Sequence, residues 1–219
     1  MNSFINVLLL LVSFPTMLVA IFVGFDLPLE FLGTTGARLP FRNEIFLGLG
    51  LALLVISLFR TVRRWMGIRM TAQTSKFAYS TFVSSGRKTR IWYYTLLESA
   101  VLFSLAYGWY TLTPEAWFPA SVLAFFGAEN IFFILVNRNR FRVGLTSKAI
   151  LVSDREVALI YLKGLRQVSI SQQTIYFDYI QQLQLTFPLD CVPESEKAPF
   201  FEALKSKIDR DKVLFRVEP

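Results

Sequence analysis

Two glutamates lie inside long apolar stretches of the sequence. Glu98 is in the run Ile91 to Leu112, and Glu129 is in the run Ala116 to Val136. Each is seven residues from the basic end of its run, which at about 1.5 Å per helical residue places both carboxyls roughly 10 Å inside a membrane. An ionisable group at that depth is costly and marks a candidate functional site. If the carboxyls face each other and share a proton, with Asn130 beside them, they could begin a proton relay or a cation site.

A second interpretation gives the same two glutamates a structural role. They would then pair with the basic residues near 60 to 69, or with a partner subunit, and serve packing or water contact. Transport pathways usually contain more polar or glycine-interrupted helix than these runs do. Both interpretations stay open at the level of the sequence.

The composition places these runs in a membrane. Hydrophobic residues make up 53% of the 219-residue chain, charged residues make up 18%, and the mean hydropathy is +0.45. A soluble domain carries roughly 25% charged residues. The chain has no histidine and one cysteine, which excludes Ser-His and Cys-His nucleophiles, histidine-bound metals and an intrachain disulfide. We therefore expect a protein that is not an enzyme, with no catalytic residue, no metal and no cofactor.

Four apolar runs predict four transmembrane helices, since about 20 residues cross the hydrocarbon core. The expected spans are 4–25, 42–62, 91–112 and 116–136. The second is ambiguous, because its apolar centre is short enough for a re-entrant segment. Only Thr113, Pro114 and Glu115 separate the last two spans, which predicts a tight antiparallel hairpin.

Basic residues set the expected orientation. The segment from 60 to 90 has no acidic residue, whereas the loop from 26 to 44 and the turn at 113–115 have few basic ones, so both termini are expected in the cytoplasm. The segment could also bind anionic headgroups of the lipid bilayer, or act only as a topology determinant. A net charge of +7 could suggest nucleic acid, but the charge clusters beside the spans, so we expect no nucleic-acid partner. The basic residues are Arg60, Arg63, Arg64, Arg69, Lys76, Arg87, Lys88 and Arg90.

The remaining third of the chain, 138–219, has the pattern of a small separate domain. Short β-branched or aromatic runs bounded by turn residues predict six strands, and Pro199 to Ile208 predicts an amphipathic helix. Antiparallel strands closed by one helix form an α+β arrangement. The predicted strands are 141–145, 149–152, 157–162, 168–170, 175–179 and 183–187.

This segment resembles the C-terminal domain of YcxB-like proteins, a bacterial family related to pleckstrin-homology-like domains. The similarity is carried by the strand order, by Phe187-Pro188-Leu189-Asp190, by the acidic linker that follows, and by Phe200-Phe201-Glu202-Ala203-Leu204. It implies a pleckstrin-homology-like fold after membrane helices, in a bacterial inner membrane. It implies no particular activity.

Our leading hypothesis is a non-enzymatic integral membrane protein in which four helices anchor a cytoplasmic binding or scaffold domain. Lys163 and Arg166 are the candidate contacts to a protein partner or to a second copy of the chain, within a larger assembly. The alternative is a small proton- or cation-coupled transporter or channel subunit that uses Glu98 and Glu129.

Overall fold

The chain divides into two compact units. The helical unit comprises Met1–Val62 and Tyr94–Leu135, and the sheet unit comprises Arg63–Tyr93 and Val136–Pro219. The sheet unit thus adds residues 63–93 to the C-terminal domain that the sequence predicts. The computed structural model describes residues 2–30, 33–171, 173–181, 183–208 and 213–217.

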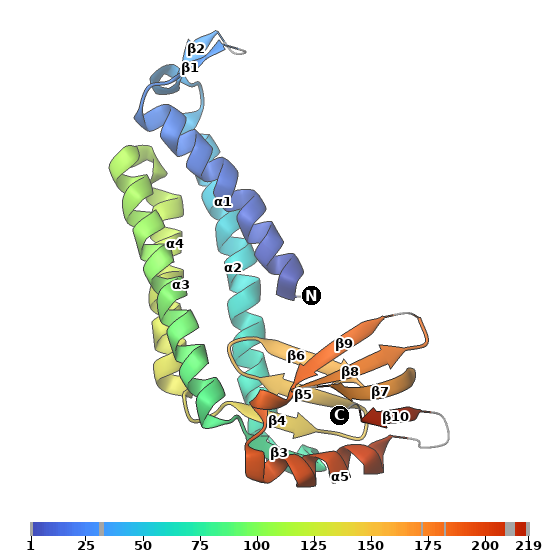
Figure 1. Cartoon of the computed structure of the whole chain (residues 1–219). Helices are drawn as coiled ribbons and strands as arrows, with labels where there is room; N and C mark the ends of the chain where they lie inside the picture. The colour runs from blue at the N-terminus through green and yellow to red at the C-terminus, as the bar shows by residue number, and fades with distance from the viewer. Residues whose placement is uncertain (1, 31–32, 172, 182, 209–212, 218–219) are drawn as a thin grey trace. The chain divides into compact units, whose positions relative to one another are not determined.

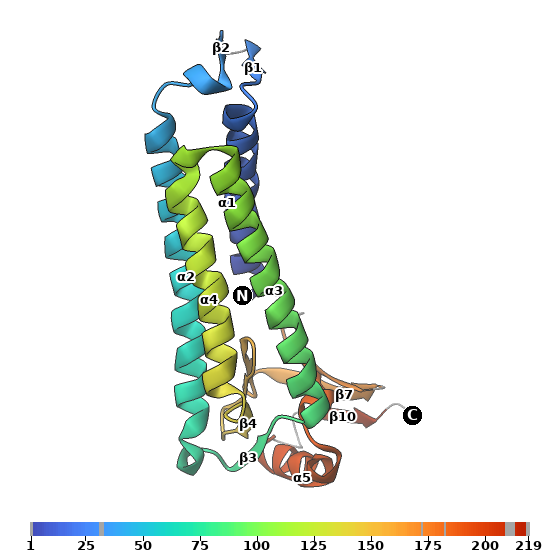
Figure 2. The same ribbon diagram turned by 90° about the vertical axis from the view of Figure 1, so that its left-hand side faces the viewer.

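Within these described ranges, four long helices supply the helical unit, and three of them also have residues in the sheet unit (Figure 1). They are α1 (Asn2–Gly24), α2 (Arg42–Ala72), α3 (Ser85–Leu112) and α4 (Trp117–Asn137). α3 and α4 lie side by side and are joined by the 3-10 turn η4 (Pro114–Ala116), in agreement with the predicted hairpin (Figure 2). Between α1 and α2, the two-residue strands β1 (Pro28–Leu29) and β2 (Thr34–Thr35) pair antiparallel, and the 3-10 turn η2 (Gly36–Arg38) follows.

Three of these helices are long and apolar enough to cross a membrane. The three segments are Val7–Gly24, Arg42–Ala72 and Pro114–Asn137, and the last comprises the turn η4 and α4. The second apolar run therefore forms part of a continuous 31-residue helix, which is longer than the predicted span because no proline interrupts residues 60–72. α3 has 28 residues and carries more tyrosine and tryptophan than the other three long helices, and it is not among the three.

The interior of the helical unit is formed by residues from all four helices. Phe46 and Leu53 of α2 are fully buried, as is Ala20 of α1, and Trp109 of α3 is almost so. The outward faces are also apolar: Leu10, Leu51 and Leu97 are each more than half exposed. A surface of this kind is unfavourable in water and is suited to lipid.

Across the residues that the structure describes, the sheet unit contains two four-stranded sheets. One has the order β3-β4-β5-β6 and is antiparallel throughout, and the other has the order β10-β7-β8-β9, in which β10 pairs parallel to β7. Two of the eight strands, β3 and β10, lie outside the six runs that the sequence predicts. The strands are β3 (Tyr79–Phe82), β4 (Arg142–Leu145), β5 (Ala149–Ser153), β6 (Val157–Tyr161), β7 (Leu165–Ser171), β8 (Thr174–Tyr179), β9 (Gln184–Pro188) and β10 (Leu214–Val217).

The helix α5 (Lys197–Lys207) joins the two sheets through one aromatic cluster. Phe200 is fully buried; its ring stacks on Phe187 of β9 at 5.4 Å between centroids and meets Tyr79 of β3 edge-on at 5.8 Å. Two short 3-10 turns, η5 (Leu189–Cys191) and η6 (Glu194–Glu196), connect β9 to α5. The strand β3 is therefore part of the core of the sheet unit, although α3 and α4 separate it from β4 in the sequence.

Candidate functional site

Glu98 is held by an arginine of the neighbouring helix. Arg60 of α2 forms a two-point ion pair with it: Nη1 lies 2.5 Å from Oε1, and Nη2 lies 3.0 Å from Oε2. Both side chains are about four-fifths buried. A bidentate guanidinium–carboxylate pair is the strongest common geometry for such groups. The structure therefore brings Glu98 to a basic residue of the 60–69 region, as the structural interpretation of the sequence predicts.

Glu129 also contacts α2, one residue further along. The hydroxyl of Thr61 donates to Oε2 of Glu129 over 3.3 Å. Asn130, which follows Glu129 on α4, is buried. On α3, the buried Ser99 hydroxyl donates to the main-chain carbonyl of Thr95. α2 thus provides a contact for each of the two glutamates, through Arg60 and Thr61.

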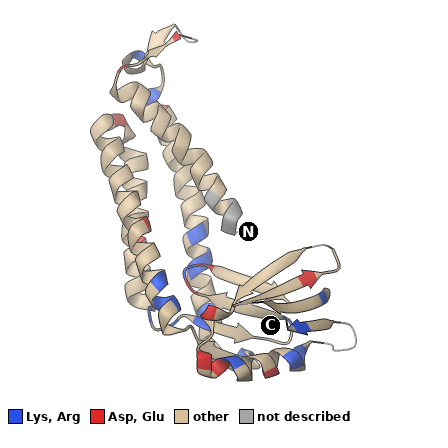
Figure 3. Ribbon diagram, in the orientation of Figure 1, with Lys and Arg blue, Asp and Glu red and all other residues tan. Residues whose placement is uncertain are grey.

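The eight basic residues of the 60–90 segment have different environments. Lys and Arg gather on the later part of α2 and the first part of α3 (Figure 3). Arg64 is buried, and Arg63 donates from Nη2 to the carbonyl of Val157 over 3.4 Å. Arg69 and Lys76 are exposed. Contact with lipid headgroups stays a prediction for these side chains.

In the sheet unit, Arg87 is at the centre of an ion network at the start of α3. Its Nε and Nη2 donate to Oδ2 of Asp154 over 3.2 and 3.0 Å, and its Nη1 lies 3.8 Å from Oδ2 of Asp190. Arg90 forms a closer ion pair with Asp190. Burial opposes the charge of Arg87 most strongly, but Asp154, Cys191 and Asp190 together outweigh burial and raise the pKa of Arg87 above its ordinary value.

The same network encloses the only cysteine of the chain. The Ser84 hydroxyl donates to the carbonyl of Asp190 over 2.6 Å, and the Ser84 main-chain N–H donates to the carbonyl of Cys191 over 3.0 Å. Cys191 is buried, and burial raises the pKa of its thiol to about 12. A thiol in this state is protonated and unreactive near neutral pH. The sequence contained no signal for Asp154 or Asp190, because their arginine partners lie 67 and 100 residues away.

Lys163 and Arg166 are both exposed, and exposed apolar side chains lie at the two turns next to them. Tyr161, Ile180 and Leu183 are 57%, 72% and 53% exposed. The turn after β6 and the turn after β8 are fastened together: the Tyr179 hydroxyl donates to the carbonyl of Tyr161 over 2.6 Å, and the Ile180 N–H donates to the carbonyl of Gly164 over 3.1 Å. We call this set the partner surface; it consists of Tyr161, Lys163, Arg166, Ile180 and Leu183.

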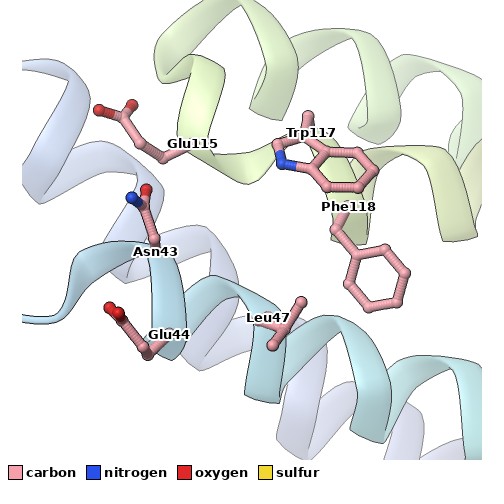
Figure 4. Close-up of a pocket in the computed structure, with 6 residues that line it drawn as sticks. All are labelled: Asn43, Glu44, Leu47, Glu115, Trp117 and Phe118. Atoms are coloured by element: carbon pink, nitrogen blue, oxygen red, sulfur yellow. The ribbon is translucent and has the colours of Figure 1, made fainter.

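A cavity of about 330 Å³ lies in the helical unit between the start of α2 and the start of α4. Asn43, Glu44 and Glu115 place polar groups on one side of it, and the rings of Trp117 and Phe118 lie on the other (Figure 4). Next to it, Arg42 pairs with Glu115 over 2.7 Å. No sequence motif marks this cavity, because its lining comes from two distant segments.

Comparison with known proteins finds no matching family model, curated protein or solved structure. In the part of the chain that the structure describes, no group of three or more Cys, Asp or Glu side chains is placed to hold a metal ion. The function of this chain is therefore inferred from its own geometry.

Proposed function

We propose that this chain is a non-enzymatic integral membrane protein of a bacterial inner membrane, in which four helices anchor a cytoplasmic binding domain that recruits a protein partner. The domain would serve as a scaffold or assembly subunit. Its antiparallel strands and the helix α5 support a relationship to pleckstrin-homology-like domains of the YcxB-like type.

The partner surface carries the proposal. It combines exposed tyrosine and aliphatic side chains with a lysine and an arginine, and tyrosine and arginine are enriched where protein interfaces gain most of their energy. Two hydrogen bonds fix the turns that bear these residues, so little conformational entropy is lost when a partner binds. A partner with an apolar centre and an acidic rim fits this surface.

We expect a partner to dock on the exposed side chains here and not to add a strand to the edge of the sheet. β6 is an edge strand of its sheet, but two of its carbonyls already accept hydrogen bonds, that of Val157 from Arg63 and that of Tyr161 from Tyr179. An added strand needs a continuous row of open main-chain groups. The occupied carbonyls therefore favour docking on the exposed side chains.

The packing of α3 supports a fourth span. Trp109 and Ala106 of α3 are buried in the same apolar core as residues of α1, α2 and α4. The short turn η4 makes α3 antiparallel to α4, a helix long and apolar enough to cross. With four crossings the chain would end on the side where it began. The basic residues of 60–90, together with Arg138, Arg140 and Arg142, support a cytoplasmic location for that side.

The test is co-purification of the tagged full chain from its native membrane. Lys163→Glu with Arg166→Glu should lower the recovery of the partner at least about tenfold, since like charges across an interface cost several kcal/mol. The matched control is Lys205→Glu with Lys207→Glu, two exposed positions on α5 with the same change of charge. Equal recovery in all three proteins would reject the partner surface, and a chain that purifies without any partner would reject the scaffold role. Point changes are preferable to removal of 138–219, because that deletion would leave β3 without its paired strand.

The contacts of Glu98 and Glu129 favour a structural role for these residues. Glu98 is neutralised by Arg60, and Glu129 accepts a hydrogen bond from Thr61. Transport through the two glutamates stays a prediction.

A further inference from the structure

Two cationic side chains approach one exposed aromatic ring in the sheet unit. The guanidinium carbon of Arg142 lies 3.9 Å from the centroid of the Phe82 ring, and the ammonium nitrogen of Lys88 lies 5.4 Å from it. Phe82 itself is 44% exposed. Each cation is attracted by the face of the ring, but the two positive charges repel each other.

The fold fixes this arrangement. Phe82 on β3 and Arg142 on β4 are directly opposite each other in the antiparallel register, so their side chains lie on the same face of the sheet. The N–H of Val83 donates to the carbonyl of Phe141 next to this pair. Two residues later α3 begins, and the N–H of Lys88 donates to the carbonyl of Ser84. The three side chains therefore meet where β3 leads into α3 and where α4 leads into β4.

The acidic residues near the start of α3 are occupied by other arginines. Arg87 and Arg90 are three residues apart and share one face of the helix, from which they pair with Asp154 and Asp190. Lys88 is rotated about 100° from Arg87 around the helix axis. Among the described residues, neither Lys88 nor Arg142 forms an ion pair with a carboxylate.

We propose that Phe82, Lys88 and Arg142 form a binding site for the phosphate group of an anionic lipid. A phosphate between the two cations would relieve their repulsion. The planar guanidinium of Arg142 can donate two parallel hydrogen bonds to it, and Lys88 contributes a point charge. The ring of Phe82 suits the boundary between headgroups and acyl chains, where aromatic side chains accumulate.

A lipid is favoured over a soluble phosphate because of where the site lies along the chain. Lys88 precedes Ile91, the first residue of the expected third span, by three residues, or about 5 Å of helix. Arg142 follows the end of α4 by five residues, and the exposed Arg138 and Arg140 lie between them. This step rests on the four-span anchoring in the proposed function and is independent of the partner surface.

The experiment is lipid binding by the purified full chain in a neutral detergent, followed by native mass spectrometry. Short-chain phosphatidylglycerol is titrated against phosphatidylcholine of the same chain length. The unmodified chain should prefer phosphatidylglycerol, and Lys88→Gln with Arg142→Gln should weaken that binding about tenfold or more, as expected for two basic contacts. The control Lys205→Gln with Lys207→Gln removes the same charge from α5 and should bind like the unmodified chain.

Three results would overturn the proposal. They are an unmodified chain that binds both lipids equally, a Lys88→Gln, Arg142→Gln variant that keeps its preference, or an equal loss in the α5 control. A further arm adds inorganic pyrophosphate, which should displace the lipid only at higher concentration than free phosphatidylglycerol does. Displacement at lower concentration would assign the site to a soluble phosphate and overturn the lipid assignment.

Two additional variants keep the result interpretable. The single change Lys88→Gln leaves the strand pairing of Phe82 and Arg142 intact and should still weaken lipid binding about threefold or more. Arg142→Lys keeps the charge and should retain the preference for phosphatidylglycerol. The same Lys88 and Arg142 variants keep Lys163 and Arg166, so their recovery of the protein partner is measured as well. Membrane topology is measured by labelling. These two measurements distinguish failure of the lipid site from failure of the proposed function.

Discussion

Arg60 of α2 and Glu98 of α3 form a two-point ion pair inside the helical unit, with nitrogen–oxygen distances of 2.5 and 3.0 Å. The pair connects α2 to α3 at a position where each helix carries a charged side chain. Partly buried charges are stable together but costly when one is removed, because the other loses its compensation. This asymmetry makes the pair a direct test of whether Glu98 is structural or takes part in transport.

We expect Glu98→Gln to lower the stability of the full chain in detergent by roughly 3 kcal/mol, the scale for breaking a buried ion pair. Arg60→Gln should cost about as much, and the double variant should lose clearly less than the sum of the two. Thermal unfolding provides the measurement, and Glu44→Gln, at an exposed position, is the control. If Glu98→Gln leaves stability unchanged but abolishes proton flux in proteoliposomes, the transport hypothesis is favoured instead.

The sequence predicts a similar depth for the two glutamates but does not determine the direction in which their side chains point. Equal spacing from the helix ends placed Glu98 and Glu129 at one level, whereas their contacts to Arg60 and Thr61 depend on how the helices are rotated about their axes. Rotation is set by packing of the whole bundle, and the apolar faces of these helices are too uniform to reveal it. The sequence offered the basic residues near 60 to 69 as partners, but local spacing could not show which of them pairs with Glu98, 38 residues from Arg60.

Long apolar runs and alternating strands were predictable for a simpler reason. A helix or strand that buries one continuous apolar face has apolar residues at regular spacing in its local sequence. The six predicted strands and α5 show this spacing. β3 has only four residues within a basic segment, and β10 follows α5 and pairs parallel with a distant strand. Their strand character depends on partners elsewhere in the chain.

Substitution of Gly67 tests whether residues 63–72 of α2 pack against the sheet unit. A Cβ added to Gly67 would lie 2.1 Å from Cγ2 of Val157 on β6, so Gly67→Ala should force the strand or the helix to shift. We expect a loss of about 1–3 kcal/mol, the usual cost of overpacking. The control Gly86→Ala meets open space and should be neutral or stabilising by up to about 1 kcal/mol. Equal stability of both variants would show that α2 does not pack on β6 in this way.

The reaction rate of Cys191 with a maleimide measures how well the segment enclosed by the ion network is buried. It is the only cysteine of the chain, and at pH 8 its buried, protonated thiol should react with a maleimide at least about a hundredfold more slowly than in denaturant. Ser84→Ala removes the hydrogen bond to the carbonyl of Asp190 and should speed the reaction several-fold. Ser85→Ala changes an exposed neighbour and should leave the rate unchanged. Rapid labelling of the unmodified chain would contradict the burial of this segment.

The sheet unit should lose stability at alkaline pH. Burial raises the pKa of Cys191 to about 12, and burial together with the Glu196 carboxylate, which accepts the Tyr79 hydroxyl at 2.8 Å, raises the pKa of Tyr79 above its ordinary value. The folded chain therefore keeps protons that the unfolded chain releases from about pH 9 for the thiol and about pH 10 for the phenol. Their contribution is complete below those values and is lost as the pH rises toward the folded pKa.

Thermal unfolding of the full chain between pH 8 and 11 measures this effect. The unfolding temperature should fall as the pH rises, and Tyr79→Phe with Cys191→Ala should make the fall shallower. The double variant should also begin from lower stability, since Tyr79→Phe removes a hydrogen bond to a carboxylate worth about 1.5–3 kcal/mol. Tyr93→Phe is the control, because the Tyr93 side chain is 70% exposed. An unchanged slope in the double variant would mean that groups other than Tyr79 and Cys191 govern alkaline unfolding.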